Sequence, residues 1–193
     1  MNNGLLFFSM CFSLCLVQAQ CDQPIAQTIA FTNGNEVETS YCGSINDRGQ
    51  RDGKGKLKYI NYDISYEEGV WKNNRLNGKG KCVYSNGDVY EGLYKNGTLV
   101  DGMFSANNNG NLWTYNGKFN GIYFQGEGIE RKESGNQIRI KEGEFFSDKL
   151  YDGIEVIFYK NSGIEITSKY VKGIPTVVNR NDINSFKAAD IVG

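Results

Sequence analysis

Hydrophobic and polar residues alternate with a period of two over much of this chain, a pattern typical of β-strands. The clearest stretch is 79–85, which is followed at once by Asn86-Gly87 and then by a second alternating stretch at 88–94. Asn-Gly between two such stretches favours a tight two-residue turn, because both residues tolerate a positive φ. Residues 79–94 are therefore predicted to form a β-hairpin.

The same hairpin signature recurs along the chain. A Gly followed two residues later by a large apolar residue occurs at spacings of 26, 23, 25 and 26 residues, at Gly43, Gly69, Gly92, Gly117 and Gly143. Because a lone hairpin is marginally stable in water, successive hairpins are expected to stack and bury an aromatic stripe. The predicted spine of that stripe is Trp71, Tyr84, Tyr94, Phe119 and Phe145. The fold class predicted from these repeats is all-β.

The repeat resembles a known family. Residues 66–80 (YEEGVWKNNRLNGKG), followed by 84–92 (YSNGDVYEG), are similar to a MORN (membrane occupation and recognition nexus) repeat. Two positions depart from the pattern: Glu68 is an extra residue, and Asn74 stands where the family has Gly. The resemblance covers residues 41–173. It implies an elongated single-layer antiparallel sheet of hairpins, non-catalytic contacts with other proteins and, for some members, binding of lipid headgroups.

The ends of the chain differ from the repeat array. Residues 1–19 lack charged side chains and contain a short apolar core, which predicts a signal peptide cleaved after Ala19 and a periplasmic or secreted protein. The alternatives are an uncleaved membrane anchor and a lipoprotein at Cys21, where Gln20 occupies the small-residue position. Residues 20–40 are expected to form an N-terminal strand or cap. Residues 174–193 are expected to form a tail or a short capping helix.

Cysteine spacing predicts one disulfide and no metal site. After the predicted cleavage the chain keeps Cys21, Cys42 and Cys82. Cys21 and Cys42 both flank the irregular N-terminal stretch and are the expected pair. Cys82 lies within a predicted strand and is expected to be a small buried hydrophobe. Three cysteines without His match no zinc pattern.

The amino-acid composition excludes several classes of function. The chain has 24 Gly and no His, which excludes His-dependent catalytic triads and His metal sites. It carries 21 basic and 22 acidic residues, so the net charge of −1 gives no general attraction to nucleic acid. No phosphate-binding loop or nucleophile elbow is present, and no cofactor is expected. A hydrolase built on paired carboxylates, such as Glu142 with Glu144 or Asp148 with Asp152, is kept as a distant alternative.

Local charge and the aromatic residues outside the predicted spine suggest two binding hypotheses. The first is a protein-binding scaffold that uses the sheet face or an open edge, through outward lysines and aromatics outside the spine such as Trp113 or Tyr123. The second is peripheral binding to anionic lipid through a basic strand face. By period two, this basic face would be formed by Lys54, Lys56, Lys58, Lys79 and Lys81. The alternative interpretation of these lysines is an outer face that contacts only solvent.

Overall fold

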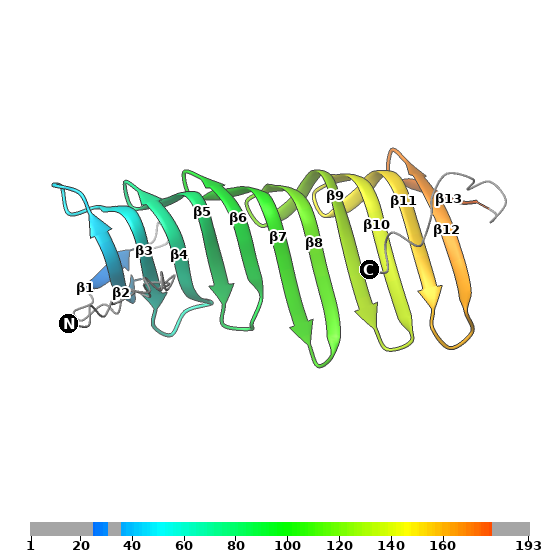
Figure 1. Ribbon diagram of the computed structural model, residues 1–193, viewed down its shortest axis with the longest axis horizontal. Helices are drawn as coiled ribbons and strands as arrows, with labels where there is room; N and C mark the ends of the chain where they lie inside the picture. The colour runs from blue at the N-terminus through cyan, green and yellow to red at the C-terminus, as the bar shows by residue number, and fades with distance from the viewer. Residues whose placement is uncertain (1–24, 31–35, 179–193) are drawn as a thin grey trace, which may run out of the picture.

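The computed structural model describes residues 25–30 and 36–178, and this part of the chain is one open antiparallel sheet (Figure 1). Its strands pair in sequence order, so each contacts its neighbours along the chain. They are β1 (Ile25–Ala30), β2 (Glu36–Ile45), β3 (Arg51–Tyr59), β4 (Ile64–Lys72), β5 (Arg75–Tyr84), β6 (Val89–Lys95), β7 (Thr98–Asn108), β8 (Asn111–Asn120), β9 (Tyr123–Ser134), β10 (Gln137–Phe146), β11 (Lys149–Tyr159), β12 (Ile164–Val171) and β13 (Ile174–Val178).

This architecture confirms the predicted all-β sheet of successive hairpins. The described residues contain no helix, and hence none long and apolar enough to cross a membrane. The expected signal peptide (1–19) and the expected capping helix around 182–190 lie outside the described residues. At both ends the sheet extends beyond the 41–173 array. Strand β1 and the start of β2 come from the 20–40 segment, and β13 pairs with β12 after residue 173.

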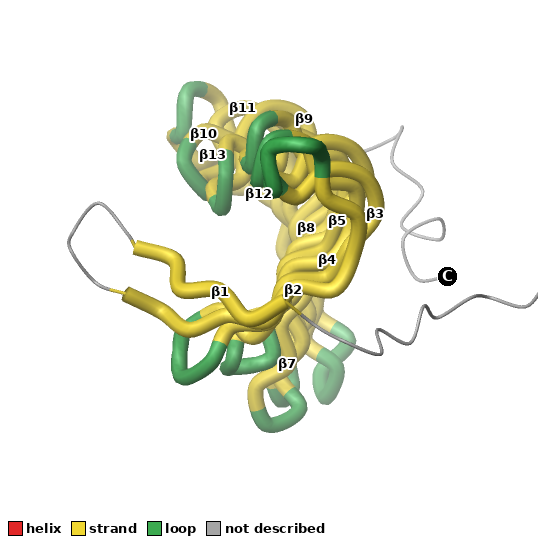
Figure 2. Tube along the Cα trace, turned by 90° about the vertical axis from the view of Figure 1, so that its left-hand side faces the viewer, coloured by secondary structure: helices red, strands yellow, loops and turns green. Residues whose placement is uncertain are grey.

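One row of glycines crosses ten strands in register. From β2 to β11 the paired residues are Gly43, Gly55, Gly69, Gly80, Gly92, Gly102, Gly117, Gly128, Gly143 and Gly153. A Cβ atom added at Gly92 would lie 2.1 Å from the carbonyl oxygen of Asp101. Because the row positions carry no side chain, the backbones of neighbouring strands approach closely there. Viewed along its length, the sheet curls into a hook (Figure 2).

The hydrophobic core lies on the inner side of this hook. Its buried members are Tyr41, Leu57, Trp71, Leu76, Tyr94, Leu99, Phe104, Tyr115, Phe119, Phe124, Phe145 and Leu150. The rings of Tyr115 and Phe124 stack with centroids 3.9 Å apart. Each such side chain contributes about 1.5–3 kcal/mol of transfer free energy on burial. The stacked aromatic residues thus replace the second layer that most sheets need.

Four residues of the predicted spine belong to this core and one does not. Trp71, Tyr94, Phe119 and Phe145 are buried. Tyr84 is only half-buried, because it ends β5 beside the hairpin turn, away from the glycine row. Its ring packs edge-on against Tyr90 instead, with the centroids 5.6 Å apart.

Hydrogen bonds attach each linking turn to the hairpin before it. The side chain of Asn74 accepts a bond from the backbone N–H of Arg51 at 2.8 Å, and its own N–H donates to the Arg51 carbonyl at 3.0 Å. Asp148 makes the same two bonds with Phe124, at 2.7 and 3.1 Å. Asn74 and Asp148 both have a positive φ, a conformation that Asn and Asp tolerate. These bonds fix the spacing of the hairpins.

Candidate protein-binding surface

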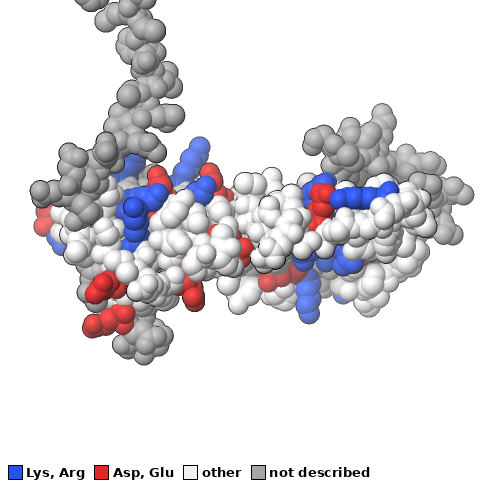
Figure 3. All heavy atoms as spheres, turned by 90° about the horizontal axis from the view of Figure 1, so that it is seen from below, with Lys and Arg blue, Asp and Glu red and all other residues white. Residues whose placement is uncertain are grey.

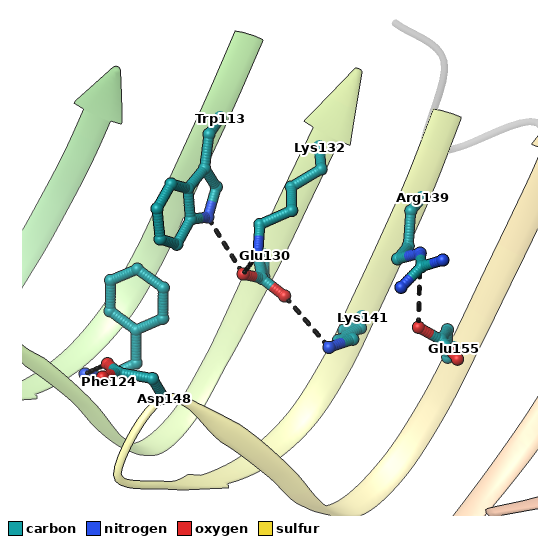
Figure 4. Close-up of polar contacts among 8 residues, drawn as sticks. All are labelled: Trp113, Phe124, Glu130, Lys132, Arg139, Lys141, Asp148 and Glu155. Atoms are coloured by element: carbon teal, nitrogen blue, oxygen red, sulfur yellow. Dashed lines mark hydrogen bonds and ion pairs between the residues drawn. The ribbon is translucent and has the colours of Figure 1, made fainter. Parts of the chain in front are cut away.

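A group of polar side chains interrupts the apolar inner face in the C-terminal half of the sheet. The residues are Trp113 on β8, Glu130 and Lys132 on β9, Arg139 and Lys141 on β10, and Glu155 on β11; we call them the inner-face cluster (Figure 4). The antiparallel register brings them together, because Glu130 pairs with Lys141 and Lys141 pairs with Glu155. Opposite charges therefore alternate across three neighbouring strands, an arrangement that stabilises a sheet.

Glu130 is the centre of the inner-face cluster. Its side chain is 2% exposed, and its Oε1 accepts hydrogen bonds from Trp113 Nε1 and lies 2.9 Å from Lys132 Nζ. Its Oε2 lies 3.4 Å from Lys141 Nζ, so both oxygens have partners. Lys132 Nζ also lies 4.1 Å from the centre of the Trp113 ring, which is cation–π distance. The buried carboxylate thereby holds the indole and two ammonium groups in fixed positions.

Glu155 anchors the neighbouring part of the cluster. Its Oε1 lies 3.6 Å from Arg139 Nε, and its Oε2 accepts a hydrogen bond from the Tyr170 hydroxyl at 3.0 Å. Burial, together with this carboxylate, raises the pKa of the Tyr170 hydroxyl. Tyr170 therefore stays protonated and keeps donating at neutral pH.

The outer ends of the cluster remain accessible. Trp113 is half-buried, and the side chains of Lys132 and Arg139 are 43% and 39% exposed. These three residues pair across β8, β9 and β10, so they form one continuous row. Trp and Arg are the side chains most enriched at protein–protein binding hot spots. Sequence reasoning singled out Trp113 but missed Lys132 and Arg139, which the strand register alone places beside it.

A second polar group lies in the N-terminal half and has a structural role. The Tyr59 hydroxyl donates to Glu67 Oε2 at 2.6 Å, and burial raises the pKa of both groups. Arg51 is 8% exposed, and its Nη2 donates to the Asn74 carbonyl at 3.0 Å while its guanidinium lies 4.9 Å from the Trp71 ring centre. These residues tie the first hairpins to the linking turn.

The predicted lysine face is divided by an acidic strand. Lys54, Lys56 and Lys58 lie on β3, and Lys79 and Lys81 lie on β5, with β4 between them. Two acids of the same face neutralise part of the row: Lys56 lies 3.0 Å from Glu68, and Lys81 lies 3.3 Å from Glu91. In the view of Figure 3, basic and acidic side chains lie among one another. The structure thus shows a mixed outer face at these lysines.

The structure also places two of the predicted cysteine sites and Tyr123. Cys42 is disulfide-bonded, while Cys21 lies outside the described residues, so that pairing stays a prediction. Cys82 is free and buried, and burial raises the pKa of its thiol to about 12, which keeps it protonated. Tyr123 is exposed at the β8–β9 turn. The described part of the chain contains no group of His, Cys, Asp or Glu side chains suited to a metal ion.

The carboxylate pairs considered for hydrolysis have other partners or lie apart from the inner face. Asp148 accepts the backbone N–H of Phe124, and Asp152 accepts that of Lys172 at 3.0 Å. Glu142 and Glu144 alternate with Gly143, which belongs to the inward-facing glycine row, so both point to the outer face. The hydrogen bonds of the linking turns therefore account for Asp148 and Asp152.

Comparison with known proteins agrees with the resemblance seen in the sequence. The family model of the MORN repeat matches residues 47–64 and 68–89, which span β3 to the start of β6. A search of curated proteins gave no match. MORN repeats are generally non-catalytic binding modules, with proteins or lipids as partners. The in-register glycine row continues from these copies to β11. The chain therefore contains MORN repeats, matched at residues 47–64 and 68–89.

Proposed function

We propose that this chain is an exported, non-enzymatic scaffold that binds another protein through the accessible row of Trp113, Lys132 and Arg139. The observation that carries the proposal is the inner-face cluster itself. A half-buried indole lies beside Lys132, Arg139 follows on the next strand, and buried carboxylates hold all three in place. Binding to such a surface costs little side-chain entropy, because its rotamers are already fixed.

The charges of the cluster indicate the chemistry of the partner. Its three cations, Lys132, Arg139 and Lys141, outnumber its two carboxylates, Glu130 and Glu155, which leaves a net charge of +1. The accessible side chains are those of Trp113, Lys132 and Arg139, whereas Lys141 and both carboxylates are largely buried. A partner segment with acidic side chains beside an apolar or aromatic residue would complement this surface.

Other parts of the proposal rest on the sequence and the family. Export rests on the apolar, uncharged segment at residues 5–17. A binding role rests on the MORN repeats, which are generally non-catalytic. We do not extend the proposal to lipid, because Glu68 and Glu91 pair with two of the five lysines that would make the basic face.

The test is capture of the partner from a native envelope or secreted extract. Tagged protein, expressed from the full-length chain, would be compared with a Lys132→Gln/Arg139→Gln double variant. A matched Lys54→Gln/Lys58→Gln variant removes two cations from the outer face. Eluted proteins and lipids would be identified by mass spectrometry.

The proposal expects one protein to be enriched by the wild type and by the outer-face variant, and to be lost with the inner-face variant. Circular dichroism would verify that all three proteins are folded. Equal capture by both variants would show that the inner face is not the binding surface. Enrichment of anionic lipid alone, abolished by the outer-face variant, would favour the lipid hypothesis instead.

A further inference from the structure

Asparagine followed directly by glycine occurs at six positions in the described part of the chain. This dipeptide is prone to a spontaneous reaction, because Gly has no side chain to keep its backbone nitrogen away from the carboxamide of the Asn before it. In a folded protein, a hydrogen bond made by that glycine N–H opposes the reaction. The six residues are Asn77, Asn86, Asn96, Asn109, Asn116 and Asn120.

Two of the six pairs lie in linking turns, and both are held by the hairpin before them. The N–H of Gly97 donates to the carbonyl of Leu76 at 2.8 Å. The N–H of Gly121 donates to the carbonyl of Leu99 at 3.1 Å in the same way. Neither nitrogen can approach the preceding side chain unless the turn first detaches from its neighbour.

Three further pairs are held within hairpins. In the β5–β6 turn, the N–H of Gly87 donates to the carbonyl of Tyr84 at 3.0 Å. Gly78 lies within β5 and pairs with a residue of β6, and Gly117 lies within β8 and pairs with residues of both neighbouring strands. Reaction at any of these sites first requires the loss of this hydrogen bond or strand pairing.

Gly110, in the β7–β8 turn, lacks such an anchor. Its N–H donates to the side-chain Oδ1 of Asn107, at 3.3 Å, and to no backbone carbonyl of the described residues. Residues 107–111 are all exposed, and a Cβ added at Gly110 would have no atom within 4 Å outside its chain neighbours. Because the acceptor is an exposed side chain, its bond exchanges for one with water at little cost.

A matched pair of turns isolates the effect of this hydrogen bond. Asn96 and Asn109 have φ angles of 50° and 51°, and the glycines after them have φ angles of 84° and 83°. All four residues are exposed. The two turns share the Asn-Gly sequence and these φ angles, and they differ in the acceptor of the glycine N–H.

The β7–β8 turn also has room to rearrange. It is the free tip of its hairpin and projects beyond the neighbouring turns at the lower rim of the sheet (Figure 1). Rotation about the Cα–C bond of Asn109 first disturbs the last pair of the ladder, Asn108 with Asn111. Opening at such a tip lies at the low end of the free energies of local unfolding.

We propose that the fold selects Asn109 as a modification site, at which the side-chain amide is converted to an acid. The Gly110 nitrogen bonds to Cγ of Asn109 as its proton passes to water, and the side-chain nitrogen leaves as ammonia. Water then opens the resulting cyclic imide at either carbonyl and gives aspartate or isoaspartate. The sum is asparagine plus water to acid plus ammonia, with no change in oxidation state.

The product changes the turn in charge and in length. Both acids add one negative charge at the tip of the hairpin that carries Trp113. Isoaspartate also routes the backbone through Cγ, which lengthens the two-residue turn by one carbon and removes the geometry that Asn-Gly favours. The modification is therefore detectable by charge as well as by mass.

The experiment follows all six sites in the purified protein, expressed from the full-length chain. The protein is incubated in mildly alkaline buffer, once folded and once in concentrated urea, and is then digested. Mass spectrometry measures the fraction of acid at each site, and water labelled with heavy oxygen marks the acid formed during the incubation. Asn109→Gln removes the reactive site, and Asn96→Gln is its matched control.

In the folded protein, Asn109 is expected to convert at least about tenfold faster than the other five residues, since each of those must first lose its hydrogen bond or strand pairing. In urea the six rates are expected to agree within about threefold, because the unfolded chain keeps no fixed acceptor. On isoelectric focusing, the folded wild type and Asn96→Gln should accumulate an acidic form that Asn109→Gln does not.

Equal rates at Asn96 and Asn109 in the folded protein would overturn the proposal. So would an advantage of Asn109 that persists unchanged in urea, because the sequence and not the fold would then select this site. An acidic form that accumulates equally in Asn109→Gln would place the reaction at another residue.

Discussion

Removal of the buried carboxylate of Glu130 should destabilise the C-terminal half of the sheet strongly. The change Glu130→Ala leaves the ammonium of Lys141, whose side chain is 18% exposed, without its counter-ion. It also removes the acceptor of the Trp113 indole N–H. Breaking a buried ion pair by removing one partner costs about 3–5 kcal/mol. The contact with Lys132 adds about 1 kcal/mol or less, because that side chain is 43% exposed.

We therefore expect Glu130→Ala to lower the free energy of unfolding by about 3–5 kcal/mol, a large part of the stability of a typical domain. Urea titrations at neutral pH, followed by circular dichroism and tryptophan fluorescence, would measure the loss. Glu127→Ala on the same strand is the matched control, since Glu127 is exposed and its removal should cost about 0.5 kcal/mol or less. If both variants unfolded within about 1 kcal/mol of each other, the inner-face cluster would not be the buried, charge-coupled unit described above.

Three further predictions concern the fold. Gly92→Ala should lower the free energy of unfolding by about 3 kcal/mol or more, because the new Cβ would overlap the facing strand. Gly110→Ala has open space around it and should lower this free energy by about 1 kcal/mol. Chemical denaturation would measure the difference between the two variants. Glu67→Gln should stabilise the protein at neutral pH but not near pH 4. Burial raises the folded-state pKa of Glu67, so its protonated carboxyl stabilises the folded state at pH values below the unfolded-state pKa. This stabilisation is lost as the pH rises through the folded-state pKa. Asp148→Ala should lower the free energy of unfolding by about 2–3 kcal/mol, because it removes one turn hydrogen bond and places Ala at a positive φ; the loss is measurable as a lower midpoint of thermal unfolding.

The fold could be predicted because its determinants are local. Asn86-Gly87 specifies a turn by itself, and the recurring Gly-x-apolar signature repeats one hairpin many times. The same signature located Trp71 and Phe119 in the core, since each follows a row glycine by two residues. Tyr84 shares their face of the strand but lies near the turn, and distance from the glycine row is not visible in alternation alone.

The candidate site could be predicted only in part, because it depends on contacts between strands. Trp113 stood out as an aromatic residue outside the spine, but its partners Lys132 and Arg139 come from two other strands. Glu130 has the sequence context of any exposed acid, and only the curl of the sheet buries it. The lysine face failed to form one basic area for the same reason: β4 carries Glu68 between the two lysine strands.

The contact of the inner-face cluster with a protein partner is the central proposal for this protein. Photo-crosslinking tests this claim directly, with a crosslinking amino acid at position 132 and, in a separate protein, at position 54 on the outer face. After irradiation in the native extract, adducts would be resolved by mass and identified by mass spectrometry. We predict one dominant protein adduct from position 132 and none of that protein from position 54. Adducts from position 54 alone, or the same adducts from both positions, would contradict the account.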